Sequence, residues 1–151
     1  MSGISIDQIK QLREETGLSV GECKKALENA QGDMARAKEL LREWGDRVVE
    51  KKRERQTTQG LIESYVHSNG KIGVLLEVHC ETDFVSMSLD FKNLCHALAL
   101  QIVSMGAESV DELLSQEYIK DPQKNMRGLL TEAIAKLGEN IVVERFSRFQ
   151  I

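Results

Sequence analysis

The hydrophobic pattern of the chain changes its period near residue 60, and this change restricts the possible folds more than any other feature. Before that point, apolar residues recur at the three- and four-residue spacing of helices. Over residues 72–78 they alternate instead, as on one buried face of a strand. The pair Asn69 and Gly70, just before this stretch, is a strong hairpin signal and indicates a preceding strand over residues 61–67. This order predicts a helical domain followed by a domain that contains a sheet.

Residues 1–46 are predicted to form three short amphipathic helices. Ser19 and Glu22 have the spacing of a capping box at the start of the second helix, and Gly32 separates the second helix from the third. Three such helices with short joints predict a compact bundle, near the lower size limit of an independent core. The helices are expected over residues 5–15, 19–29 and 33–44.

A charged segment over residues 47–59 is expected to link the bundle to the second domain, as a surface helix or a hinge. Residues 57–60 are its expected point of loosening. Its lysines and arginines could form a nucleic-acid contact, but Glu50 and Glu54 lie among them and the chain carries a net charge of −4. A solvated helix end is therefore the preferred interpretation, and we expect no direct contact with nucleic acid.

Residues 60–151 are expected to form an α+β domain, in which a small, mostly antiparallel sheet packs with helices. In the last strand, Ile141, Val143 and Arg145 are expected to share one face. Residues 120–122, which contain the single proline, are expected to form a turn or to start a helix. Helices are predicted over residues 88–104, 109–115 and 126–137, and the last strand over residues 141–149.

Catalytic and metal-binding patterns are missing from the sequence. The histidines His67, His79 and His96 fall in different predicted elements, and the three cysteines form no CxxC pair. Neither of the phosphate-binding patterns GxxxxGK[ST] and GxGxxG occurs. The chain is therefore expected to be no enzyme, to hold no metal or cofactor, and to act by binding a partner.

No segment is expected to cross a membrane. The longest apolar runs, such as residues 73–76, are far shorter than the ~20 residues that a membrane helix needs. No apolar stretch follows Met1 as it would in a secretory signal, and three cysteines do not suggest a disulfide framework. The expected location is the cytoplasm, or the matrix of an organelle if a transit segment has been removed.

Two segments are candidate contact sites. In the first, Phe84 lies beside Asp83 in the turn that follows a hydrophobic strand. Phe84 either packs back into its own core or forms an exposed aromatic anchor beside a charge, and the spacing favours neither alternative. The second segment, residues 17–21, joins two helices and contains Leu18 and Val20. These two residues belong either to the core or to a contact surface, and the small size of the bundle favours the core.

Three blocks of the sequence closely resemble the translation elongation factor Ts family. The first contains Thr16 and Gly17, the run CKKAL at residues 23–27, and then Gly32 and Asp33. The second is EVHCETDFV at residues 77–85, and the third is IAKLGENIVVERF at residues 134–146. The blocks follow one another in order and span nearly the whole chain, so together they are far more specific than any single motif.

This resemblance implies both a fold and a function. Residues 1–46 would be the ubiquitin-associated-like domain of the family, which docks on the nucleotide domain of elongation factor Tu, and residues 60–151 would be a core domain of the dimerisation type. The protein would be the guanine nucleotide exchange factor of elongation factor Tu. It would bind the GDP-bound and nucleotide-free forms of Tu and weaken their hold on Mg²⁺ and GDP.

By the same match, residues in both domains would contact Tu. Phe84 would wedge into an apolar pocket close to the Mg²⁺ site, Asp83 would support that contact, and Thr82 and Val85 would flank the pair. Many members of the family have two methionines in the first loop, where this chain has a valine and a glycine, so the apolar contact there would be smaller. In the helical domain, the contact positions would be Arg13, Val20, Gly21 and Lys24.

The chain resembles a short form of the family. Few residues separate Met105 from the third block, where longer members have a second half or an inserted helical segment. Short members work as homodimers, so the resemblance implies a homodimer here. Two alternatives stay open: a protein that binds Tu without exchange activity, and a ubiquitin-associated adaptor.

Overall fold

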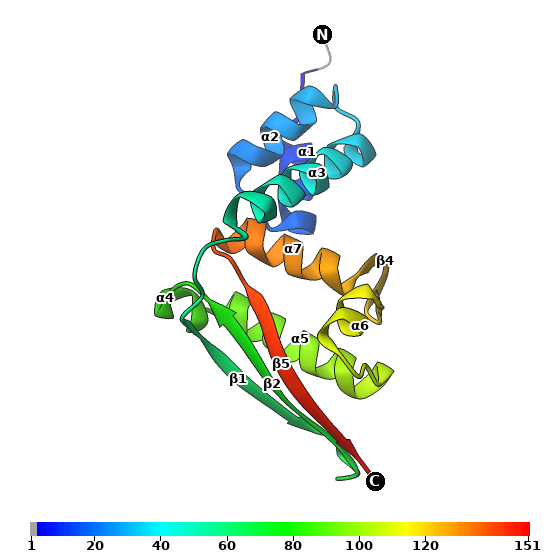
Figure 1. Cartoon of the computed structure of the whole chain (residues 1–151). Coiled ribbons are helices and arrows are strands. Elements are labelled where there is room, and N and C mark those ends of the chain that lie inside the picture. The colour runs from blue at the N-terminus through cyan, green and yellow to red at the C-terminus, as the bar shows by residue number, and fades with distance from the viewer. Residues whose placement is uncertain (1–2) are drawn as a thin grey trace. The chain divides into compact units, whose positions relative to one another are not determined.

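The computed structural model describes residues 3–151, so the first two residues of the predicted bundle lie outside the described part. The chain divides into two compact units, with the boundary between Lys51 and Lys52. Helices come first and a small antiparallel sheet follows, which confirms the α+β class (Figure 1). Among the described residues, no helix is both long and apolar enough to cross a membrane.

The helical unit consists of α1 (Ile6–Thr16), α2 (Val20–Asn29) and α3 (Met34–Lys52). Ser5 and Ser19 each form a full capping box with the residue three positions later, which satisfies amide groups at the starts of α1 and α2. Gly17 ends α1 in the left-handed conformation, with φ 69°. The buried side chains of this unit are Leu12, Leu18, Cys23, Ala26, Leu27, Ala30, Ala37 and Leu41.

Helix α3 is longer than the sequence pattern predicted, because it continues past Trp44 to Lys52. Gly45 lies inside the helix and is buried, while Val48 and Val49 are half-buried. The packing of these residues offsets the weak helix propensity of glycine, which explains why the helix does not end there.

The second unit is built on a three-stranded antiparallel sheet of β1 (Gln59–Val66), β2 (Ile72–Cys80) and β5 (Val142–Gln150), with β2 in the middle. The predicted hairpin is confirmed, since Val66 pairs with Gly73 and Gly70 adopts a left-handed φ of 67° in the turn. Gly60 belongs to β1, so it is not part of a loosened joint. A Cβ atom at this position would lie 2.1 Å from the carbonyl oxygen of Val78. The close approach of the two strands requires a glycine at this position.

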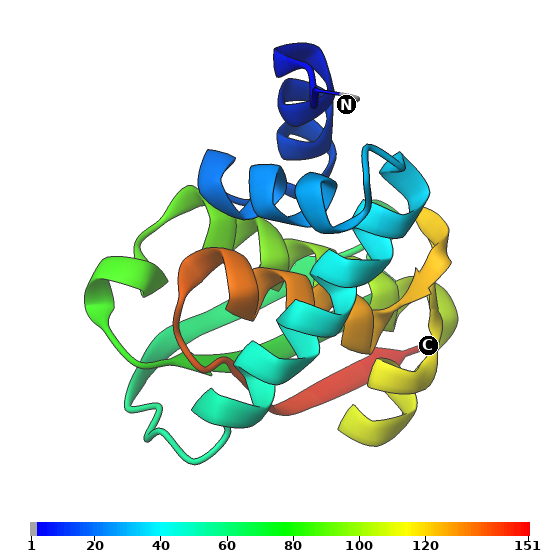
Figure 2. The same ribbon diagram turned by 90° about the horizontal axis from the view of Figure 1, so that it is seen from above.

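Helices cover one face of this sheet. The helix α5 (Leu89–Met105) packs on β1 and β2, and α7 (Met126–Leu137) packs on α5. Both lie on the same side of the sheet in Figures 1 and 2. The fully buried residues of this layer include Phe91, Leu98 and Ile102 of α5 and Leu76 and Val78 of β2. The alternation in β2 thus places its apolar face in the core, as predicted.

A short element between α5 and α7 differs from the prediction. After α6 (Val110–Ser115), the strands β3 (Glu117–Tyr118) and β4 (Asp121–Asn125) form a second, two-stranded sheet. Residues 121 and 122 therefore begin a strand, whereas we expected a turn or a helix start. The buried Gln101 of α5 fixes this hairpin, because its amide donates to the carbonyl of Glu117 (2.9 Å) and its carbonyl accepts from the amide of Ile119 (3.1 Å).

The other face of the main sheet is open. Because side chains alternate along a strand, Ile62, Val66, Leu75 and Phe149 point to this face, and each is more than half exposed. No helix of this unit covers them within residues 52–151 (Figure 1). Several large apolar side chains exposed on one strand face are typical of an interface.

A bulge in β5 changes which residues reach the open face. Glu77 pairs with Arg145, but the next residue, Val78, pairs with Val143, so Glu144 is an extra residue in the ladder. Val143 is buried, whereas Arg145 lies on the open face with its Nε 3.4 Å from Glu77 Oε2. The expectation that these two residues share one face is therefore wrong, because the inserted residue reverses the alternation between them.

Candidate functional site

Phe84, which has the most exposed aromatic side chain among the described residues, lies shortly after the end of β2. There Thr82 is the N-cap of α4 (Asp83–Ser86), with an extended backbone (φ −129°, ψ 154°) and a side-chain oxygen that accepts from the amide of Val85 at 3.3 Å. Ser88 caps α5 directly afterwards, so the two helices follow one another with almost no joint. The sequence thus builds a single helical turn that projects beyond the sheet (Figure 1).

Phe84 on this turn is 88% exposed, which excludes the alternative that it packs back into its own core. Its neighbour Asp83 is exposed as well, whereas Val85 is only 5% exposed and belongs to the core. On a helical turn, consecutive residues point in different directions, so burial of Val85 anchors the turn while Phe84 faces away. Met87 and Leu89, which the sequence analysis did not single out, are also exposed beside it.

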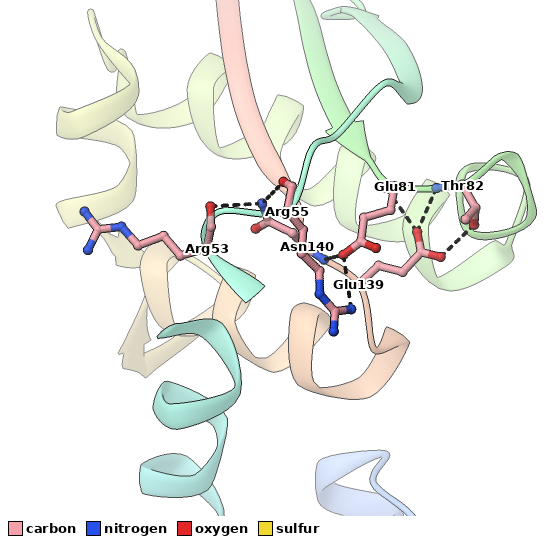
Figure 3. Close-up of polar contacts among 6 residues, drawn as sticks. All are labelled: Arg53, Arg55, Glu81, Thr82, Glu139 and Asn140. Carbon is pink, nitrogen blue, oxygen red and sulfur yellow. Dashed lines mark hydrogen bonds and ion pairs between the residues drawn. The ribbon is translucent and has the colours of Figure 1, made fainter. Parts of the chain in front are cut away.

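The turn is held by a carboxylate that comes from the far end of the chain. Glu139, in the loop between α7 and β5, accepts hydrogen bonds from the backbone amides of Glu81 (3.1 Å) and Thr82 (2.9 Å). Its second oxygen accepts from the hydroxyl of Thr82 at 2.6 Å. Figure 3 shows the Glu139 side chain directed at the backbone just before α4.

A second set of contacts runs in the opposite direction. The carboxylate of Glu81 accepts from the backbone amide of Asn140 at 2.8 Å and lies 3.7 Å from the guanidinium of Arg55. The side-chain amide of Asn140, which is buried, donates to the carbonyl of Arg55 at 3.0 Å and reaches that of Arg53 at 3.5 Å (Figure 3). The loop after α7 therefore ties together the start of the second unit and the loop before α4. Glu139 and Asn140 belong to the third block of the sequence, but no local pattern there indicated these contacts.

Three candidate residues of the helical unit lie near the start of α2, and the fourth, Arg13, lies in the last turn of α1. Val20 is 49% exposed, and Gly21, Lys24 and Arg13 are exposed as well. Lys24 forms only a loose ion pair, with its Nζ 3.9 Å from Glu28 Oε1. Leu18, in contrast, is buried, so the loop between α1 and α2 contributes Leu18 to the core, while Val20 at the start of α2 lies at the surface.

Nothing among the described residues forms a metal cluster of three or more His, Cys, Asp or Glu side chains. Cys80 and Cys95 are buried. Burial raises the pKa of the Cys95 thiol to about 12, and burial together with the charge of Glu139 raises the pKa of Cys80. Both thiols are therefore protonated at neutral pH, which makes them poor nucleophiles.

Comparison with known proteins gives a consistent result over the chain. A model of the family Elongation factor TS matches residues 81–151. The elongation factor Ts of Thermoanaerobacter sp. (strain X514) is 39% identical over 192 aligned positions, which cover 97% of this chain and 94% of that protein. The elongation factor Ts of Coprothermobacter proteolyticus is 41% identical, with 98% of each chain covered. That of Thermotoga maritima is 41% identical over 98% of this chain and 96% of its own.

These alignments are longer than the chain itself. The alignment to the Thermoanaerobacter protein has 192 positions, against 151 residues here. These relatives therefore contain segments that have no counterpart in this chain.

Proposed function

Because this chain belongs to the elongation factor Ts family, which acts in translation elongation, we propose that it is the guanine nucleotide exchange factor of elongation factor Tu. It binds Tu with GDP, promotes the loss of Mg²⁺ and GDP, and leaves an empty site for GTP. No bond is made or broken in the protein during this cycle. We place this activity in the cytoplasm, or in an organelle matrix.

The observation that carries the proposal is the exposure of Phe84. An aromatic side chain that is 88% exposed beside Asp83 leaves a large apolar surface in water and adds no packing to the core of its own unit. Large aromatic residues next to charges are typical of interface hot spots. In this proposal, Phe84 inserts as a wedge into an apolar pocket of Tu close to its Mg²⁺ site, and Asp83 supports the contact.

The exchange mechanism follows from linkage. A ligand can shift Tu towards its nucleotide-poor form only if it binds that form more tightly than the GDP-bound form. The coupling is reciprocal, so GDP and this protein weaken the binding of each other. A wedge that fits only when the Mg²⁺ and phosphate region is displaced provides such a difference in affinity.

The experiment that tests this function is stopped-flow release of a fluorescent GDP analogue from Tu, with and without this protein. We expect the release rate to rise with its concentration and then to saturate. Binding to Tu without faster release would favour a scaffold or inhibitor. Absence of binding to Tu, together with binding of ubiquitin, would favour the adaptor.

We also propose that the helical unit provides a second contact, through Arg13, Val20, Gly21 and Lys24. Replacing Lys24 by alanine is expected to weaken the affinity for Tu about threefold at low salt, because an exposed cation mainly steers association. The effect should fade as the salt concentration rises. Titration by surface plasmon resonance at two salt concentrations measures it, with Lys10→Ala, another exposed lysine of the same unit, as the control. Equal affinity of Lys24→Ala and wild type at low salt would remove Lys24 from the contact.

The open face of the main sheet supports the proposal that the protein is a homodimer. Leu75 lies in the middle of this face and Val66 and Phe149 lie at the end nearer the hairpin turn, while Ile62 lies next to the paired Glu77 and Arg145. Two copies of such a face can pack against each other as a sandwich, which removes both apolar surfaces from contact with water. A dimer of this kind would supply two Phe84 turns per particle, as expected for a short member of the family.

The substitution Leu75→Glu is expected to convert the dimer into monomers, because Leu75 is the exposed residue at the centre of the middle strand. A buried, unpaired charge at that position would cost several kcal/mol per interface. Light scattering after size exclusion should then give about half the wild-type mass. Ile119→Glu, which changes a half-exposed residue outside this sheet, is the control and should stay dimeric. A wild-type protein of monomeric mass with full exchange activity would contradict the dimer.

A further inference from the structure

The Phe84 turn is too short to hold its own shape. The helix α4 contains four residues, whereas isolated helices shorter than about 12 residues are marginal in water. Phe84 gives the turn no support, since it faces solvent. Its orientation therefore depends on the buried Val85 and on the hydrogen bonds that fix its N-cap residue, Thr82.

The hydroxyl group of Thr82 forms hydrogen bonds with both Glu139 and α4. This hydroxyl donates to Glu139 Oε2 at 2.6 Å and accepts from the amide of Val85 at 3.3 Å. Because a hydroxyl has one hydrogen, its donation to the carboxylate leaves its lone pairs free for the helix amide. The other carboxylate oxygen holds the amides of Glu81 and Thr82. Both oxygens of Glu139 are thus engaged by the residues that precede α4.

Glu139 is itself held in place by the scaffold. It follows Gly138, which ends α7 in the left-handed conformation with φ 74°. The residue after it, Asn140, is tied through its amide to Glu81 and through its side chain to the carbonyl of Arg55. The side chains of Glu81 and Glu139 thus cross between the two loops in opposite directions (Figure 3). Such a paired connection fixes both the distance and the angle between the loops.

We propose that Glu139 is a positioning residue for nucleotide exchange. It holds the Phe84 turn in the orientation that binds Tu, so that little free energy is lost in ordering the turn on association. This role rests on the proposed function of Phe84 in exchange. Glu139 does not touch Tu in this scheme, and its effect passes to the wedge through the hydrogen bonds that it accepts from Glu81 and Thr82.

The test measures GDP release from Tu with Glu139→Ala, in the wild-type and in the Phe84→Ala background. In the wild-type background, we expect release at limiting concentration to be about tenfold slower, because a contact that is misplaced by an ångström loses much of its effect. In the Phe84→Ala background, we expect less than a further twofold loss, since the wedge is already gone. A purely structural role would give the same loss in both backgrounds.

Two further variants make the result specific to the carboxylate of Glu139. Glu139→Gln keeps one acceptor oxygen but cannot accept the Thr82 hydroxyl with its amide nitrogen, so it should restore part of the activity. Glu132→Ala removes another carboxylate, which belongs to α7 and pairs with Lys124 at 2.8 Å, and should leave release unchanged. Hydrogen exchange of residues 83–86 should be faster in Glu139→Ala than in wild type, with the sheet amides unaffected.

The outcomes separate this role from the proposed function. If Glu139→Ala accelerates GDP release as fast as the wild-type protein does, in an assay in which Phe84→Ala is defective, the positioning role is overturned. The exchange function would stay intact. Equal losses in the two backgrounds would also overturn the positioning role. A wild-type protein that does not accelerate GDP release would overturn the exchange function, and the positioning role with it.

Discussion

Replacing Phe84 by alanine should slow the stimulated release of GDP from elongation factor Tu by one to two orders of magnitude, while the protein stays folded. The loss corresponds to removing an aromatic hot-spot residue, which typically contributes at least ~2 kcal/mol to a contact. Stability should not fall, because the side chain is 88% exposed and gives up no core packing. Stopped-flow release and thermal unfolding of the same sample measure the two quantities.

The control for this variant is Met105→Ala. Met105 is also an exposed apolar residue, with 51% of its surface accessible, but it lies at the opposite end of α5 from the Phe84 turn. We expect wild-type release from it. A Phe84→Ala protein that melts many degrees lower yet exchanges normally would mean that Phe84 serves the core, and the wedge would have to be abandoned.

Replacing Leu76 by alanine should lower the free energy of unfolding of the second unit by about 2–5 kcal/mol. Leu76 is fully buried at the middle of the central strand, where it pairs with Glu63 on one side and Phe146 on the other. Its removal leaves a cavity under α5 that the close-packed layer cannot fill. Denaturant unfolding followed by circular dichroism measures the change, and the slope of the transition shows whether the native state stays compact.

A matched leucine provides the comparison for that measurement. Leu89 starts α5 and is 72% exposed, so Leu89→Ala removes the same atoms from water-exposed surface. Its effect should stay within about 0.5 kcal/mol. If Leu76→Ala proved as stable as Leu89→Ala, the assignment of the buried face of β2 would be wrong.

Most of the secondary structure could be predicted because its signals are local. The capping box of Ser19 and Glu22 marks the start of α2 within four residues, and Asn69 with Gly70 marks a turn within two. The alternation over residues 72–78 determines which side chains of β2 are buried. These signals act over a few residues, so the sequence contains them in full.

The candidate site could be predicted only in part. The resemblance to the elongation factor Ts family indicated Asp83 and Phe84, but the spacing of apolar residues left the exposure of Phe84 undecided. Its neighbour Val85 fits a contact equally well by sequence, yet it is 5% exposed. Which face of a four-residue helix points inward depends on how the following helix packs, and no periodicity can be read from so short a segment.

The sequence by itself determined the elements, their order, the apolar face of β2 and the family. The tertiary structure decided the features that depend on distant residues: the bulge that turns Arg145 to the open face, the close approach that requires Gly60, and the hold of Glu139 on the Phe84 turn. Glu139 and Glu81 are 58 positions apart, and they come within hydrogen-bond distance only because α7 packs on α5 and β5 pairs with β2. Local patterns select helices and strands, whereas contacts of this kind form only once the whole unit has folded.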